Sequence, residues 1–301
     1  MTPCETDAMA QVTLPSGIEI EYESMGDPSR PTMLWIMGFT AQMIAWHDDF
    51  MKLFVDAGYH VVRFDNRDCG LSTKFDGVDA NVEKAVMAAM MGDPAPQVPY
   101  TLSDMAADAV GVLDALGIEK AHIIGASMGG MIAQTVAIEH PHRTISLTSI
   151  MSTVGDLNYG TPTEEAMAVL TAAPPSDRAA FIEASLLARI WCSKRWFNED
   201  EARERAAREF DRMFYPEGAS RQMAAIYASG DRSDALRALE VPTLVIHGRD
   251  DLLLQPSGGE RTAELVPGAA LLMLNDMGHD VPRPLWPVFV DSIVAHVRRA
   301  S

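Results

Sequence analysis

The chain has 301 residues, of which 48% are hydrophobic, so it can bury a sizeable core and is not predominantly disordered. Its 42 acidic residues outnumber its 24 Lys and Arg residues and give a net charge of −18. This acidic balance argues against a nucleic-acid-binding protein and against docking on an anionic membrane, because both need basic surface.

The first half alternates short apolar runs with helical stretches. A hairpin is expected first, and the predicted strands are 11–14, 18–23, 32–37, 59–64, 121–125 and 145–151, with helices at 46–57, 101–116 and 128–139. Thr101 or Ser103 is the candidate N-cap of the second helix, and Gly117 ends it. Continuous apolar strands separated by helices are typical of a parallel sheet covered on both faces.

The alternation stops at about residue 152, and only helical patterns follow, at 163–171, 177–191 and 199–214. It resumes with strands at 243–247 and 270–274 and helices near 259–265 and 286–299. We therefore predict one α/β core, residues 1–151 and 239–301, into which a helical cap, residues 152–238, is inserted. A separate helical domain is the alternative, but the core pattern continues after this segment.

The sharpest local motif is Gly-Ala-Ser-Met-Gly, residues 125–129, between a predicted strand and a predicted helix. This context is typical of a nucleophile elbow, a strained turn that needs small neighbours and exposes the serine hydroxyl. The competing interpretation is a tight turn in a nucleotide-binding protein, but neither G-x-G-x-x-G nor Gly-Lys-Ser/Thr is present here. Ser127 is the predicted nucleophile.

A nucleophilic serine needs a base, and the base needs an orienting acid. His279 lies in the loop after strand 270–274 and is the predicted base. The acid is expected in the loop after strand 243–247, where Asp250 and Asp251 are adjacent. Asp251 is favoured because it lies deeper in the turn, and Asp156 is a third candidate. The N–H groups of Met128 and Phe39 are the predicted oxyanion donors.

The remaining histidines and the methionines are interpreted mainly as structural residues. Structural or surface roles are expected for the remaining seven histidines, and His47 is singled out because it lies near the presumed oxyanion loop. The 19 methionines include a cluster at 87–91 in a loop-like insertion, and most of the 19 are expected to fill the core. If Met37, Met43 or Met128 lines the pocket, the substrate is apolar.

Cysteine usage and the N-terminus agree on a compartment. Cys4, Cys69 and Cys192 are too few and too far apart for a disulfide framework or a zinc site. The start of the chain lacks a basic and an apolar signal region, and no apolar run reaches the roughly 20 residues of a membrane helix. We expect a cytoplasmic protein.

With these residues assembled, the chain resembles the α/β-hydrolase superfamily over essentially its whole length. The segment DNRDCGLS, residues 65–72, is similar to the superfamily's D-x-R-x-x-G-x-S, and VPTLVIHG, residues 241–248, to the strand before its acid. In that superfamily the catalytic aspartate falls three residues after the glycine, which implies Asp251. Met277-Gly278-His279 resembles its histidine loop.

Met37-Gly38 replaces the His-Gly that many members carry at the oxyanion loop. This form, with the DNRD segment and the ASMGG elbow, most resembles the aclacinomycin methylesterase branch, whose members hydrolyse methyl esters of bulky polyketide-like aromatics. The resemblance implies that residues 152–238 correspond to a lid over the triad that sets substrate choice.

We predict a serine esterase that uses neither a cofactor nor a metal and acts on a small-molecule ester. Rivals on the same machinery are carbon–carbon bond hydrolysis, lactone opening and aminopeptidase action. A ligand-binding receptor with vestigial hydrolysis is a rival of another class, and a purely structural protein is a third. The substrate stays open, as does the oligomeric state, a homodimer included.

Overall fold

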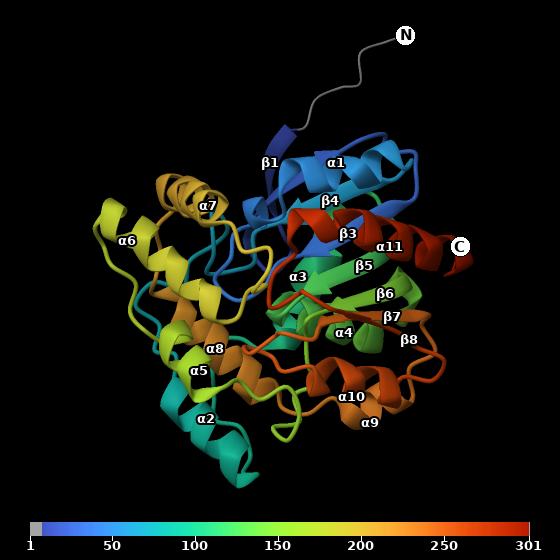
Figure 1. Cartoon of the computed structure of the whole chain (residues 1–301). Helices are drawn as coiled ribbons and strands as arrows, with labels where there is room; N and C mark the ends of the chain where they lie inside the picture. Colours follow the sequence, from blue (N-terminus) through green and yellow to red (C-terminus); the bar gives the residue numbers. More distant parts are fainter. Residues whose placement is uncertain (1–7, 301) are drawn as a thin grey trace.

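The computed structural model describes residues 8–300 and confirms the predicted α/β class (Figure 1). Eight strands form one sheet in the order β1-β2-β4-β3-β5-β6-β7-β8. The expected hairpin is antiparallel, as is the pairing of β2 with β4, and all later neighbours are parallel. The strands are β1 (Ala8–Thr13), β2 (Glu19–Met25), β3 (Thr32–Ile36), β4 (His60–Phe64), β5 (Ala121–Ala126), β6 (Thr144–Ile150), β7 (Thr243–Gly248) and β8 (Ala270–Leu274).

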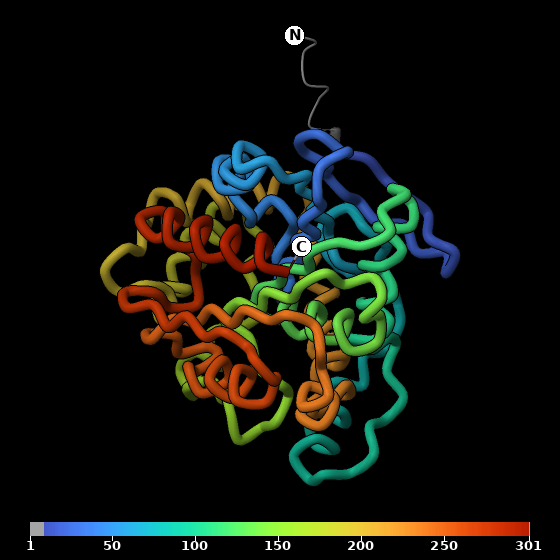
Figure 2. The backbone as a smooth tube through the Cα atoms, turned by 90° about the vertical axis from the view of Figure 1, so that its right-hand side faces the viewer, coloured from blue at the N-terminus to red at the C-terminus, as the bar shows by residue number. Residues whose placement is uncertain are grey.

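Helices cover both faces of this sheet. They are α1 (Asp48–Asp56), α2 (Val82–Met91), α3 (Leu102–Ala115), α4 (Met128–Glu139), α5 (Glu164–Leu170), α6 (Arg178–Ala184), α7 (Glu199–Arg212), α8 (Gly218–Ser229), α9 (Ser233–Arg237), α10 (Ser257–Leu265) and α11 (Trp286–Ala300). Figures 1 and 2 agree in placing α11 and α10 on opposite sides of the sheet. Every residue of β3, β4 and β5 is buried, as two covered faces require.

Two apolar clusters form the core, one on each face. On the face of α1 and α11, Trp35 from β3 packs edge-on against Phe50, with ring centroids 5.9 Å apart, and Phe289 joins the same cluster. On the opposite face, α3 and α4 pack their apolar residues against β3, β5 and β6. The central strands are therefore fixed from both sides.

Helix ends follow the sequence signals where a capping side chain is present. Thr101, rather than Ser103, caps α3 and forms a capping box with Asp104. Asn198 caps α7 by accepting from the N–H groups of Asp200 and Glu201. The expected helix 177–191 is divided, because α6 ends at Ala184 and a 3₁₀ turn, Ser185–Ile190, continues it.

Between β6 and β7 the structure contains only helices, α5 to α9, which we call the helical segment (residues 152–238). In Figure 1, α5, α6, α7 and α8 gather with α2 beside the sheet. Two of these helices, α8 and α9, were not predicted from the sequence. Their N-cap positions, Glu217 and Arg232, provide no side-chain capping bond, so the usual start signal is missing.

The interpretation of 87–91 as a loop-like insertion is wrong. These residues belong to α2, which packs on α8. Met87, Met90 and Met91 are 61%, 73% and 68% exposed, so they face away from the core. Asn81 precedes α2 with a φ of 52° and no side-chain capping bond, which explains why the helix start was not recognised.

The chain order creates a crevice at one edge of the sheet. The chain passes from β3 to β4 on one side of it and then crosses back, so that β5 lies on the other side of β3. Ligand sites of open α/β sheets lie at the carboxyl ends of the strands where the order reverses in this way. The loops after β3 and β5, which contain Phe39 and Ser127, both begin at this point.

No helix within residues 8–300 is long and apolar enough to cross a membrane. Cys69 and Cys192 are buried free thiols, and burial raises the pKa of both. Cys4 lies outside the described residues.

The core on the α11 face gives a stability prediction. Phe289→Ala should lower the free energy of unfolding by about 3–5 kcal/mol, because the ring is fully buried and leaves a cavity. Urea unfolding measures this change. Val288→Ala, at a 38% exposed position of the same helix, should change stability by about 0.5 kcal/mol or less. Equal losses in both variants would contradict the packing described here.

Candidate active site

Ser127 lies in a strained turn between β5 and α4. Its backbone adopts φ 56° and ψ −124°, which a non-glycine residue tolerates only when its surroundings impose it. The N–H of Ser127 donates to the carbonyl of Ile150 at 2.9 Å, and Ser152 Oγ donates to the Ser127 carbonyl at 2.9 Å. The end of the neighbouring strand β6 and the loop that follows it therefore hold the turn from one side.

Close backbone approach explains the glycines around this serine. A Cβ on Gly125 would lie 2.0 Å from the Gly129 carbonyl oxygen, and one on Gly38 would lie 3.0 Å from Ser127 Cβ. Gly125 therefore excludes a side chain unless the backbone shifts, and a side chain at Gly38 would be in tight contact with Ser127. The loop after β3 consequently lies directly against the serine.

His279 and Asp251 are brought together by the loops after β8 and β7. His279 Nδ1 lies 2.7 Å from Asp251 Oδ2, and the Asp251 side chain is fully buried. Asp251 Oδ1 accepts from the N–H groups of Leu253 and Leu254, both at 2.9 Å. Because Oδ1 is bound to the turn, Oδ2 faces the imidazole in one orientation.

The other two acid candidates make different contacts. The Asp250 N–H donates to the Met277 carbonyl, and the Asp156 carboxylate accepts from Asn158 within its own turn. Of the three aspartates, Asp251 is the one whose carboxylate contacts His279 in the structure.

A second histidine, His247, also contacts the Asp251 carboxylate and affects its pKa. Burial by itself would raise the pKa of Asp251, but the positive character and hydrogen bonds of His279 and His247 outweigh it and lower that pKa. His247 is fully buried and places Nε2 3.4 Å from Asp251 Oδ2 and 2.7 Å from the Leu254 carbonyl. The structural role expected for His247 is therefore a contact with the acid.

The N–H groups proposed as oxyanion donors are available. Phe39 follows β3, and Met128 is the first residue of α4, with its N–H at the positive end of the helix dipole. Across residues 8–300, neither N–H donates a hydrogen bond to another protein group. Two free N–H groups beside a serine can accept a developing negative charge.

A single cavity of about 890 Å³ joins these residues. Ser127, His279 and Phe39 line it, and His47 lines it too, as its place in the sequence suggested. Its wall is mainly apolar and aromatic, formed by Met37, Trp46, Phe50, Met151, Leu170, Phe181, Trp191, Met213, Phe214, Met223, Leu253, Val281 and Trp286. A volume near 900 Å³ suits a ligand of several rings.

The methionine expectation holds in part. Met37 lines the cavity, whereas Met43 and Met128 are buried elsewhere. Met151, Met213 and Met223 line it instead, and two of these come from the helical segment. Proximity to Ser127 in the sequence therefore does not identify the lining residues, because much of the cavity wall belongs to the helical segment.

Asp280 is a carboxyl group that the sequence did not single out. It lines the cavity directly after His279, and its Oδ1 accepts from the N–H groups of Ser193 at 2.9 Å and Gly278 at 3.2 Å. Burial raises the pKa of Asp280 to about 6, although these hydrogen bonds oppose the shift. It fixes the histidine loop to residues of the helical segment.

The same segment contacts the histidine loop at two more points. The His279 N–H donates to the Trp191 carbonyl at 2.6 Å, and Ser193 Oγ donates to the Asp276 carbonyl at 2.6 Å. No sequence signal could reveal these contacts, because they join residues more than 80 positions apart. No cluster of three or more His, Cys, Asp or Glu side chains within the described chain could hold a metal ion.

Comparisons with known proteins identify the fold family. Residues 31–282 match the family model of the alpha/beta hydrolase fold. Rhodomycin D methylesterase DauP of Streptomyces sp. (strain C5) is 26% identical, and the match covers 93% of this chain and 95% of that protein. The 2-hydroxymuconate semialdehyde hydrolase of Pseudomonas sp. (strain CF600) is 32% identical over 57% of this chain and 59% of its own length.

A solved structure shows the same fold. The meta-cleavage product hydrolase of Pseudomonas fluorescens IP01 superposes with a TM-score of 0.73 at 22% sequence identity. The superposition covers 97% of this chain and 98% of that chain.

The raised pKa of Asp280 predicts a pH-dependent stability difference. The folded carboxyl binds its proton more tightly than the unfolded one, so it contributes a stability loss as pH rises from about 4 through about 6. Asp280→Asn keeps an oxygen for Ser193 and Gly278 but lacks the titration. Its Tm relative to wild type should rise across this window, by the equivalent of about 3 kcal/mol.

Thermal melts of both proteins between pH 4 and pH 8 measure this difference. A Tm difference that stays constant over the whole range would contradict a perturbed Asp280.

Proposed function

The chain belongs to the alpha/beta hydrolase fold family, and we propose that it is a serine hydrolase that cleaves a carboxylic ester. The observation that carries the proposal is that His279, which pairs with Asp251 at 2.7 Å, lines the same cavity as the strained Ser127 elbow. Folding alone does not require a positive φ at a serine or a buried carboxylate fixed on a histidine.

The first half of the proposed reaction acylates the serine. Ser127 Oγ attacks the acyl carbon while His279 accepts the hydroxyl proton and then gives it to the leaving alcohol. Asp251 stabilises the imidazolium and keeps Nε2 directed toward the serine, because Nδ1 is held at its carboxylate. The N–H groups of Phe39 and Met128 stabilise the oxyanion of the tetrahedral intermediate.

The second half releases the acid. Water that gives its proton to His279 attacks the acyl-enzyme, and the same N–H groups stabilise the second oxyanion. The proton then returns to Ser127 Oγ as the carboxylic acid leaves. No cofactor or metal takes part in these steps.

The lining supports an ester of an apolar, aromatic acid of several rings. Trp46, Phe50, Phe181, Trp191 and Phe214 provide flat surfaces for such a ligand. Relatives that are named rhodomycin D methylesterases support a methyl ester in particular.

The helical segment (residues 152–238) acts in this proposal as a cap. Leu170, Phe181, Trp191 and Phe214 of this segment face the same cavity as Ser127, so the segment forms the side of the pocket that determines substrate shape. The core, residues 1–151 and 239–301, provides the reacting groups.

A second candidate function is hydrolysis of a carbon–carbon bond beside a carbonyl group. The similarity to a 2-hydroxymuconate semialdehyde hydrolase favours it. The same residues would serve, with a stabilised carbanion as the leaving group instead of an alkoxide.

The ester proposal is tested with methyl esters and p-nitrophenyl esters of aromatic acids of increasing ring number. Ser127→Ala should lower kcat on the preferred ester about a thousandfold or more, because it removes the nucleophile. Ser103→Ala, at a surface serine of α3 that bonds Glu139, is the matched control and should keep the wild-type rate.

Equal rates in wild type and Ser127→Ala would overturn the proposal. Turnover of a dienoic ketone but of no ester, again lost in Ser127→Ala, would favour the second candidate.

A further inference from the structure

The loop that presents the Phe39 N–H contains a second strained residue. Thr40, an exposed residue at the rim of the cavity lining, adopts a φ of 55°, an outlier for a β-branched side chain. Such a conformation persists only when neighbouring groups fix it. The groups that fix Thr40 therefore also determine where the adjacent Phe39 N–H lies.

Three side chains hold this loop. Asn66 Nδ2 donates to the Met37 carbonyl at 2.9 Å, and Cys69 Sγ donates to the Thr40 carbonyl at 3.2 Å. Both come from the loop after β4. The third is Gln222 of α8, whose Oε1 accepts from the Thr40 N–H at 2.8 Å. Of the three, Gln222 alone belongs to the helical segment.

The side-chain amide of Gln222 is held in one orientation. Its side chain is fully buried, and Nε2 donates to the Arg67 carbonyl at 2.9 Å, so both ends of the amide are bonded to the core. Rotation of the amide by 180° would place its NH2 group against the Thr40 N–H, also a donor, and its oxygen against the Arg67 carbonyl, also an acceptor. The side chain can act as an acceptor for Thr40 in one orientation only.

The helix that carries Gln222 is itself fixed on the core. Arg221 bonds both carboxylate oxygens of the buried Asp68, at 2.8 Å and 2.9 Å. A Cβ on Gly218 would lie 2.1 Å from the Asp68 carbonyl oxygen, so the first turn of α8 lies directly on the loop after β4. A swinging motion of α8 would break a buried ion pair.

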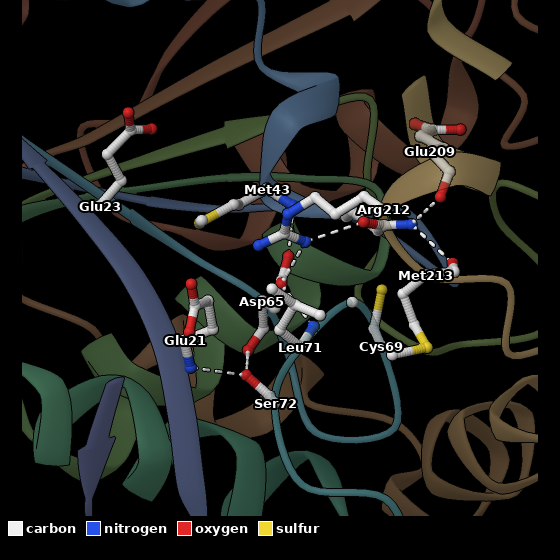
Figure 3. A network of polar contacts seen from close by, with 12 residues as sticks. Glu21, Glu23, Met43, Asp65, Cys69, Leu71, Ser72, Glu209, Arg212 and Met213 are labelled. Carbon is white, nitrogen blue, oxygen red and sulfur yellow. Dashed lines mark hydrogen bonds and ion pairs between the residues drawn. The ribbon is translucent and has the colours of Figure 1, made fainter. Parts of the chain in front are cut away.

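Helix α7 holds the other end of this loop, residues 37–43, which we call the oxyanion loop. Arg212 Nη1 donates to Asp65 Oδ2 at 2.6 Å and to Gln42 Oε1 at 2.8 Å, and Asp65 Oδ1 accepts from the Met43 N–H at 2.7 Å. Figure 3 shows the Arg212 guanidinium over the Asp65 carboxylate. Thr40 is thus bound to α8 and Gln42 to α7, and the Met43 N–H is bound to the carboxylate that Arg212 contacts.

We propose that Gln222 is a positioning residue of the hydrolase, which sets the oxyanion donor Phe39 N–H by holding the strained Thr40. This inference rests on the proposed function, since it assigns Gln222 a role in that reaction. The helical segment would then influence the rate of the catalysed reaction as well as the choice of substrate. The oxyanion exists only in the transition state and intermediates, so the role predicts an effect on kcat rather than on KM.

Gln222→Met removes both hydrogen bonds while nearly keeping the side-chain length. Its kcat should fall about 10- to 100-fold, the size of effect that a small misplacement of a reacting group produces. KM should stay within about twofold of wild type. The affinity for an aromatic trifluoromethyl ketone, which adds to the serine to form an oxyanion, should fall in parallel with kcat.

A matched control lies on the same helix. Ser229 Oγ also accepts a backbone N–H of the core, that of Leu102 at 2.9 Å, but contacts no part of the site. Ser229→Ala should keep wild-type kcat and ketone affinity.

Gln222→Asn provides a second test if Gln222→Met does not fold. It keeps a polar side chain but withdraws the amide from Thr40, so it should show the same fall in kcat. All rates are measured below the lowest Tm of the set.

Wild-type kcat in the folded Met or Asn variant would overturn the inference, as would a loss confined to KM. If Ser127→Ala is inactive while these variants keep full kcat, the inference alone fails. If Ser127→Ala keeps the wild-type rate, the proposed function fails first.

Discussion

The contact between the ends of β3 and β5 is the constraint on which the site depends. These strands are adjacent and parallel, with Ile36 opposite Gly125, so the loops that follow them emerge side by side. A Cβ on Gly129 would lie 2.2 Å from the Ile36 carbonyl oxygen, so α4 begins almost in contact with β3. The serine turn and the loop of Phe39 share the small space that remains. Strain at Ser127 follows from this crowding, whereas hydrogen bonds with Gln222 and Cys69 hold the strained Thr40.

Buried charge connects this edge of the sheet to the helical segment. The protein as a whole is strongly acidic, yet Arg221 is buried against Asp68, and Arg212 reaches the fully buried Asp65. Pairs of this kind contribute little net stability relative to apolar packing, but removing one partner leaves a costly buried charge. They therefore favour one seating of α7 and α8 over others. The same loop, residues 65–72, thereby meets the oxyanion loop on one side and the helical segment on the other.

Much of this arrangement is readable from the sequence, because its signals are local. Apolar strands, helix caps such as Thr101 and Asn198, and the glycines around Ser127 each act within a few residues of themselves. The loops that contain Asp251 and His279 follow predicted strands, so topology alone brings them to one edge. Asp280 and Gln222 could not be found in this way, because their partners are distant in the chain. Helices α2 and α8 lack capping side chains and begin without a local signal.

The distant contacts also have a consequence for how the chain folds. Thr40 and Gln222 are separated by 182 positions and Asp68 and Arg221 by 153, whereas strand pairings of the sheet span at most 96 positions, as between Leu147 and Thr243. Contacts of such high sequence separation carry a large loop-closure entropy and form slowly. The sheet can assemble from shorter-range pairings before these contacts close. Hydrolytic competence is accordingly a late event of folding, acquired after most of the secondary structure is in place.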